Sequence, residues 1–130
     1  MSVFQPSTDV DIKQLITKCS SKYCLLDPAP TQLVKQCLDI LLPAITKIVN
    51  LSLTEGYFPA NWKCSVVIPL IKKPNNDRTL QNYRPVSNLS FLSKVVEKVA
   101  VKRYQEHLTI NNQLPALNAA YKQHHSSETI

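Results

Sequence analysis

The first stretch with a regular pattern of apolar residues has the spacing of an α-helix. Four apolar residues stand at positions i, i+3, i+4 and i+7: Ile12, Leu15, Ile16 and Cys19. Ser7 or Thr8 can cap such a helix, and Asp9 and Asp11 would lie at the positive end of its dipole. The pattern therefore predicts a first helix within residues 7–20.

A second periodic stretch begins near Thr31, after a proline-stiffened connector over residues 25–30. Its apolar residues are expected to face inward: Leu33, Val34, Cys37, Leu38, Leu41 and Leu42. Pro43 has no backbone N–H, so it either kinks this helix or begins a third helix as its first residue. The third helix carries apolar residues with Ser52 at helical spacing: Ile45, Ile48, Val49 and Ser52. Gly56 is well placed to end it.

The β-branched, apolar run over residues 64–71, CSVVIPLI, is typical of a buried strand. Pro69 would confine that strand to an edge or a bulge, because proline cannot donate to a sheet ladder. The following residues, KPNNDRT, have the composition of a turn, and Pro85 biases Arg84 to an extended conformation. Together these signals predict a β-hairpin over residues 66–86.

Ser90 can cap a last long helix, which has a regular apolar stripe: Leu92, Val95, Val96 and Val99. Lys94, Lys98 and Lys102 recur every four residues beside Arg103 and form a basic stripe along the same helix. This stripe is either a face that binds nucleic acid or an ordinary solvated face. The whole pattern predicts a mainly helical α+β fold with one β-hairpin.

Glycine content restricts how the chain can bind a phosphate group. The chain has 130 residues, enough for one domain, and Gly56 is its single glycine. Glycine-patterned phosphate loops need at least two glycines where the backbone approaches phosphate, so both the P-loop and the dinucleotide fingerprint are excluded. Any phosphate bound by this chain must be held by side chains.

The net charge of +6 is confined to the second half of the chain. Residues 1–60 contain five Lys or Arg and five acids, whereas residues 61–130 contain ten Lys or Arg and four acids. This distribution indicates either an anionic partner, most plausibly nucleic acid, or a solvated basic surface.

Side chains suited to catalysis are sparse. The four cysteines have no Cys-x-x-Cys spacing and no nearby histidine, which favours free thiols over a disulfide framework or a zinc site. No aspartate follows Asp77, although two-metal catalysis needs several converging carboxylates. The sequence therefore predicts no catalytic residue and no metal site in this chain.

No targeting or membrane segment is expected from the sequence. The N-terminus has neither a basic region nor an apolar region of the signal-peptide type, and no apolar run approaches the roughly 20 residues that span a bilayer. We expect an intracellular protein, cytoplasmic or nuclear, that is not secreted and does not interact with membranes.

Cations at the two ends of the predicted reversal are candidates for a binding site. Lys72 or Lys73 on one strand and Arg84 on the other can converge on one anionic group. Lysine acts as a point charge and arginine as a planar fork, a combination suited to phosphate. Alternatively, these exposed cations only protect an edge strand from pairing with another chain.

The segment GYFPANWKCSVVIPLIKKPNNDRTLQNYRPVSNLSFLSKVVEKV resembles the N-terminal part of reverse transcriptases from non-LTR (LINE-like) retrotransposons. The residues that match the family pattern are Gly56, Phe58, Pro59, Trp62, Lys63, Val66, Pro69, Leu70, Lys72, Lys73, Asn82, Tyr83, Arg84, Pro85, Ser87, Asn88, Leu89, Ser93, Lys94 and Glu97. The upstream LLDPAPTQLVK and the final YKQHHSSETI also resemble family motifs, so the resemblance covers nearly the whole chain.

The resemblance implies a fold, an activity and partners. The chain would be the fingers part of a right-hand polymerase, without the palm, from an enzyme that performs RNA-directed DNA synthesis. The implied partners are an RNA template, a DNA primer, a dNTP and the missing palm domain, which would hold Mg²⁺. By resemblance, Lys72 or Lys73 and Arg84 would grip the triphosphate of the dNTP, whose phosphates would be the acidic partners that the sequence lacks.

The chain departs from the family in two places. Asn118 and Lys122 replace the usual Gln and Arg in a segment that helps to seat the template strand, and the Y-x-D-D motif is absent. We expect residues 1–60 to be a helical N-terminal extension and residues 61–130 to be a partial fingers region. Because the Y-x-D-D motif is absent, we expect this region to be inactive alone. The alternatives are a stand-alone basic module that binds nucleic acid, or a helical interaction fragment without a ligand.

Overall fold

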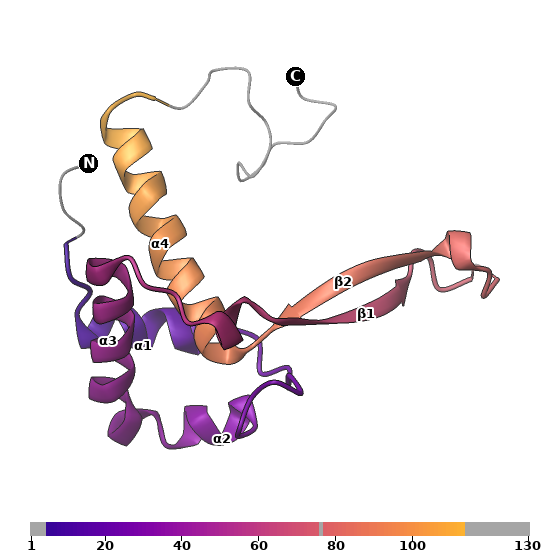
Figure 1. Ribbon diagram of the computed structural model, residues 1–130, viewed down its shortest axis with the longest axis horizontal. Coiled ribbons are helices and arrows are strands. Elements are labelled where there is room, and N and C mark those ends of the chain that lie inside the picture. Colours follow the sequence, from indigo (N-terminus) through magenta and orange to yellow (C-terminus); the bar gives the residue numbers. More distant parts are fainter. Residues whose placement is uncertain (1–4, 76, 114–130) are drawn as a thin grey trace.

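The computed structural model describes residues 5–75 and 77–113. In this part of the chain a helical body contains α1 (Asp9–Lys18), α2 (Thr31–Gln36), α3 (Leu38–Glu55) and α4 (Phe91–Ile110). Strands β1 (Ser65–Ile71) and β2 (Tyr83–Leu89) extend from this body as a two-stranded arm, which we define as residues 65–89 (Figure 1). Two 3-10 turns, η1 (Ala60–Lys63) and η2 (Leu80–Asn82), precede the two strands. The predicted fold class, mainly helical α+β with a β-hairpin, is confirmed.

Helix α1 begins with a reciprocal cap. The backbone N–H of Asp11 donates to Thr8 Oγ1 at 3.2 Å, and the backbone N–H of Thr8 donates to Asp11 Oδ2 at 3.1 Å. Each contact satisfies a donor that has no partner in the first turn of a helix. Ile12 and Ile16 are fully buried on one face of the helix. The predicted first helix and its cap are confirmed.

The second predicted helix is interrupted six residues before Pro43. The chain leaves helical geometry at Cys37 (φ −95°, ψ 16°), so α2 ends at Gln36 and α3 begins at Leu38. Pro43 lies inside α3, and the alternative that it begins a third helix is wrong. Gly56 ends α3 in the left-handed conformation (φ 62°), as predicted, because glycine adopts this conformation without steric cost.

The break at Cys37 also changes which apolar residues face inward. Helices α2 and α3 share no continuous apolar stripe, and three residues expected to face inward are exposed: Leu33, Cys37 and Leu41. Helix α3 instead buries residues that fall on its own face, at intervals of four, three and four: Leu38, Leu42, Ile45 and Val49.

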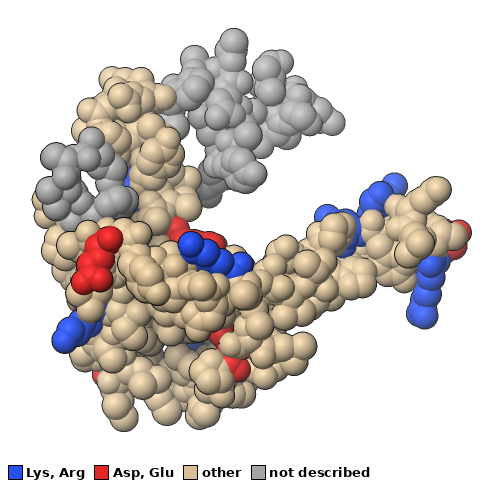
Figure 2. Space-filling model, in the orientation of Figure 1, with Lys and Arg blue, Asp and Glu red and all other residues tan. Residues whose placement is uncertain are grey.

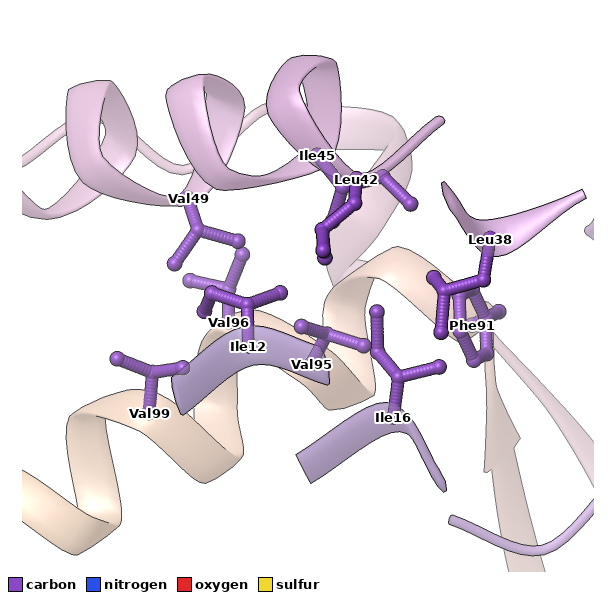
Figure 3. Packing of buried hydrophobic residues seen from close by; sticks show 10 residues of the cluster. All are labelled: Ile12, Ile16, Leu38, Leu42, Ile45, Val49, Phe91, Val95, Val96 and Val99. Atoms are coloured by element: carbon purple, nitrogen blue, oxygen red, sulfur yellow. The ribbon is translucent and has the colours of Figure 1, made fainter. Parts of the chain in front are cut away.

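The buried core lies between α1, α3 and α4. Side chains from these three helices point toward one another: Ile12, Ile16, Leu38, Leu42, Ile45, Val49, Phe91, Val95, Val96 and Val99 (Figure 3). Helices α1 and α3 come from the predicted N-terminal extension, and α4 comes from the predicted fingers region. The division at residue 60 stays a prediction.

The arm is an antiparallel hairpin in which Ser65–Ile71 pairs with Tyr83–Leu89. It includes the predicted hairpin and extends three residues beyond it, to residue 89. The prediction that its first strand is buried is wrong, because Val67, Ile68 and Leu70 are 56%, 42% and 43% exposed. The helices of the described chain pack on one another at the root of the arm, and the arm stands clear of them (Figures 1 and 2).

Pro69 and Pro85 face each other at the middle of the hairpin. The N–H of Lys72 donates to the Asn82 carbonyl at 2.8 Å, which fixes the alternation of hydrogen-bonded and non-hydrogen-bonded pairs along the ladder. Because the two kinds of pair alternate with every residue, Pro69, three residues before Lys72, forms a non-hydrogen-bonded pair with Pro85. Neither proline therefore interrupts the ladder inside the arm.

Within the residues that the structure describes, no helix is both long enough and apolar enough to cross a bilayer.

Candidate nucleic-acid interface

All four cations of the arm lie at its far end. We call them the tip cations: Lys72, Lys73, Arg78 and Arg84. Figure 2 shows basic residues at the outer end of the arm. The part of the arm between this end and the body, which we call the shaft (residues 65–71 and 85–89), carries other residues. Arg78 was missed by sequence reasoning, because the segment around it was interpreted only as a turn. Its position beside Asp77 in a reversal between two cationic strand ends was a signal that could have identified it.

The hairpin brings Lys72 and Arg84 to one face of the arm. Leu70 lies opposite Arg84, and the side chains of residues two apart in a strand point to the same side. Lys72 therefore shares the face of Leu70 and Arg84, as a diagonal neighbour of Arg84. Such neighbours are separated by about 7–8 Å, a spacing that two long side chains can close around one phosphate.

Three of the tip cations are free to bind an anion. Lys73, Arg78 and Arg84 are exposed, and within the described residues their side chains have no hydrogen bond or ion pair. Lys72 Nζ donates to the carbonyl of Gln81 at 2.8 Å, across the end of the hairpin. An ammonium group has three donors, so Lys72 keeps two of them for a ligand.

The one acid of the arm, Asp77, is used inside the turn. Its Oδ1 accepts a hydrogen bond from Asn82 Nδ2 and another from Thr79 Oγ1, the latter at 3.3 Å. Asn82 Nδ2 also donates to the backbone carbonyl of Asp77 and to Thr79 Oγ1, each at 3.1 Å. Among the described residues, no ion pair joins Asp77 to a tip cation. The tip therefore carries a formal charge of +3 from its four cations and one carboxylate.

Two lysines of the predicted basic stripe contact other parts of the chain. Lys94 Nζ donates to Asn88 Oδ1 at 2.6 Å, and Asn88 lies near the end of β2. Lys98 Nζ lies 3.2 Å from the sulfur of the buried Cys19. The amine of Lys94 therefore points toward the arm, and the amine of Lys98 points toward the residue that follows α1.

The other two cations of the stripe lie near carboxylates. Lys102 Nζ is 3.8 Å from Asp11 Oδ1 and 4.0 Å from Glu106 Oε1, and Arg103 Nη1 is 3.4 Å from Glu106 Oε2. The pKa of Asp11 is lowered, mainly because the backbone N–H and the hydroxyl of Thr8 donate to its carboxylate, and less because of Lys102 and Arg103. Since α4 leaves the body in a different direction from the arm, the structure does not bring the stripe and the tip cations together (Figure 1).

Two further predicted site residues, Asn118 and Lys122, lie outside the described residues. In residues 5–75 and 77–113, no three His, Cys, Asp or Glu side chains come close enough to hold a metal ion. A role in binding for the stripe, for Asn118 and for Lys122 stays a prediction.

A cavity of about 460 Å³ lies at the root of the arm, between the connector before α2, α3 and the start of α4. Trp62, Phe91 and Leu92 contribute to its mainly apolar lining, and Asp27 supplies its one carboxylate. Neither a lysine nor an arginine lines it, so this cavity is not suited to phosphate and is distinct from the tip.

Comparisons with known proteins agree with the sequence motifs. The chain is 31% identical to a probable RNA-directed DNA polymerase from transposon BS of Drosophila melanogaster. This match extends over 80 residues, which are 62% of the chain and 9% of that protein. It is also 27% identical to the RNA-directed DNA polymerase from mobile element jockey of the same species. This match extends over 121 residues, which are 90% of the chain and 13% of that protein. A Bradysia coprophila Pol polyprotein from the type-1 retrotransposable element R1 is 28% identical over 79% of the chain and 11% of its own length.

These relatives define a class, the RNA-directed DNA polymerases of mobile elements. Within that class, the chain is related to a segment of the reverse transcriptases of non-LTR (LINE-like) retrotransposons, as its motifs predicted. The chain spans about a tenth of the length of these relatives, between 9% and 13%. No model of a protein family matches the chain.

Proposed function

We propose that this chain is the fingers segment of an RNA-directed DNA polymerase and that its arm binds phosphate groups of nucleic acid and of the incoming dNTP. The observation that carries the proposal is the arrangement of the tip. Lys72 and Arg84 share one face, Lys73 and Arg78 are exposed beside them, and the one nearby acid, Asp77, is engaged within the turn.

The chemistry of these side chains supports phosphate as the ligand. The Arg84 guanidinium can donate two parallel hydrogen bonds to phosphate oxygens, while Lys72 and Lys73 supply charge that adapts to their position. A phosphodiester or a triphosphate would provide the negative charge that the arm itself lacks. Because such contacts reach the backbone of a nucleic acid, they would fix its position without reading its base sequence.

The proposal assigns binding to this chain, and catalysis to a palm domain elsewhere in the polymerase. Mg²⁺ would be held there, and the sequence of this chain has no Y-x-D-D motif and no aspartate after Asp77. Given Mg²⁺, an RNA template, a DNA primer and dNTPs, we expect the purified chain to extend no primer. Template-dependent extension would contradict this assignment.

Binding to single-stranded RNA tests the arm directly. We would measure fluorescence anisotropy with the wild type, Arg84→Ala, Arg84→Lys and a control, Lys47→Ala, which removes an exposed charge from α3. Arg84→Ala should weaken binding by about 1 kcal/mol, or roughly five-fold. Arg84→Lys should also weaken binding although the charge is kept, because a point charge replaces a planar fork.

The control separates a site from a general effect of charge. Lys47→Ala should bind RNA like the wild type, since Lys47 lies on the helical body away from the arm. Equal losses for Lys47→Ala and Arg84→Ala would show that net charge alone decides the affinity. A wild-type chain without measurable binding at low salt would overturn the proposed function.

A further inference from the structure

We propose that the first turn of α4 is the mount of the arm, and that Lys94 is a positioning residue of this mount instead of a contact to nucleic acid. The mount consists of Ser93 and Lys94 on α4 and of the two groups that they hold, the Trp62 carbonyl and the Asn88 side chain. Trp62 lies just before β1 and Asn88 lies near the end of β2. The mount thus holds the chain three residues before β1, at Trp62, and near the end of β2, at Asn88.

The attachment before β1, at Trp62, is made by two buried hydroxyl groups. Ser93 is fully buried, and its Oγ donates to the Trp62 carbonyl at 2.9 Å. The hydroxyls of Ser90 and Ser93 lie 2.6 Å apart. Because the single hydrogen of the Ser93 hydroxyl is directed at Trp62, the Ser90 hydroxyl must donate to Ser93. Buried hydrogen bonds of this kind are costly to break, because water cannot replace them.

The attachment at β2 is a charged contact. Lys94 Nζ donates to Asn88 Oδ1 at 2.6 Å, and hydrogen bonds from an ionised donor are short and strong. On its other side, Asn88 Nδ2 donates to the Tyr23 carbonyl at 3.3 Å, and Cys24 Sγ lies 3.5 Å from the Asn88 carbonyl. Asn88 is therefore held between α4 and the segment that joins α1 to α2, residues 19–30.

The same segment between α1 and α2 is also fixed to the start of α4. Asp27 Oδ1 accepts a hydrogen bond of 2.7 Å from the backbone N–H of Phe91, the first residue of the helix. A carboxylate at this position is favoured by the helix dipole. By contrast, the ammonium of Lys94 lies near the positive end of that dipole and gains nothing from it. Its contact with Asn88 gives a physical reason for a lysine at this position.

Fixing the chain just before β1 and near the end of β2 matters because nothing in the described chain supports the arm further out. A ribbon held at one strand can still twist about that strand, whereas one held at both strands resists twisting and bending. Each strand has seven residues and is therefore about 23 Å long, so a rotation of about 10° at the root moves the tip by about 4 Å. A shift of that size would take Arg84 out of hydrogen-bonding distance of a phosphate.

The consequence for binding rests on the proposed function, but the mount itself can be tested without nucleic acid. Spin labels on Cys37, which is exposed on the body, and on a Leu80→Cys variant at the end of the arm report the distance between them. The background would carry Cys64→Ser, because Cys64 is exposed, while Cys19 and Cys24 are buried and should stay unlabelled. The width of the distance distribution measures how firmly the arm is held.

Lys94→Met and Lys98→Met form a matched pair, because each removes one positive charge from α4 and they lie one turn apart. Lys94→Met should at least double the width of the distribution, while Lys98→Met should leave it unchanged. Lys94→Arg, which keeps a charged donor for Asn88, should restore most of the wild-type width. If Lys94→Met and Lys98→Met give the same width as the wild type, Lys94 does not position the arm.

A second variant covers the case in which Lys94→Met fails to fold, which circular dichroism would reveal. Asn88→Ala removes the acceptor of Lys94 and leaves α4 unchanged, so it should broaden the same distribution. An unchanged width in Asn88→Ala would overturn the proposal. RNA binding is absent from all of these measurements, so their failure and the failure of the proposed function can be told apart.

Discussion

The salt dependence of RNA binding gives a quantitative test of which cations contact the phosphates. Each phosphate neutralised on a single strand contributes about −0.7 to the slope of log K against log salt. If the four tip cations each engage one phosphate, the slope should be about −2.8. The association constant should then fall about 50-fold between about 50 and 200 mM salt.

A larger interface would give a clearly different value. If Lys94, Lys98 and Lys102 also contacted phosphates, seven contacts would give a slope of about −4.9 and a loss of about 900-fold over the same range. The structure favours the smaller value, because the amines of these three lysines already have partners within the chain.

The assay is fluorescence anisotropy of a labelled single-stranded RNA at several concentrations of KCl. Arg78→Ala should make the slope less steep by about 0.7, since one phosphate contact is lost. Lys47→Ala, the control on α3, should leave the slope unchanged. A slope near −5, or equal changes in the two variants, would refute the assignment of binding to the tip.

Three further predictions concern the helical body, and urea unfolding can check them all. Val95→Ala should lower the free energy of unfolding by about 2–3 kcal/mol, because Val95 is fully buried. Val101→Ala on the same helix, at a 53% exposed position, should lower it by less than about 0.5 kcal/mol. Similar losses in the two variants would contradict the core packing. Asp11→Asn should be less stable than the wild type at neutral pH. Because the pKa of Asp11 is lowered in the folded state, its contribution is present above about pH 4 and is lost as the pH falls through the folded-state pKa, so a constant difference down to pH 2 would contradict it. Gly56→Ala should cost roughly 1–2 kcal/mol from backbone strain at φ 62°, since no atom lies within 4 Å of the added Cβ, and a neutral substitution would argue against the left-handed cap.

Features fixed by residues close together in the sequence were predictable. The cap formed by Thr8 and Asp11 involves residues three apart, and Gly56 ends α3 because of its own backbone conformation. The hairpin was predicted from a turn segment between two extended runs, whereas its register is known only from the structure. Such signals are local, so the sequence alone contains them.

Features that depend on other elements were not predictable. The run over residues 64–71 has the composition of a buried strand, but whether it is buried depends on what covers it. Helical periodicity passes through Cys37 without interruption, so the apolar pattern gave no sign of the break between α2 and α3. Likewise, spacing places Lys94 and Lys98 on a basic stripe, but it carries no information about Asn88 and Cys19, which are distant in the sequence.

The facing prolines of the arm have a consequence for aggregation. In a non-hydrogen-bonded pair the backbone nitrogens point away from the partner strand, so the nitrogens of Pro69 and Pro85 lie on the two outer edges of the arm. Each edge therefore lacks one N–H donor near its middle, where an added strand would need it. Although its shaft is apolar and exposed, the arm is poorly suited to edge-to-edge stacking into fibrils. A protein surface that covers this shaft has to lie across its faces.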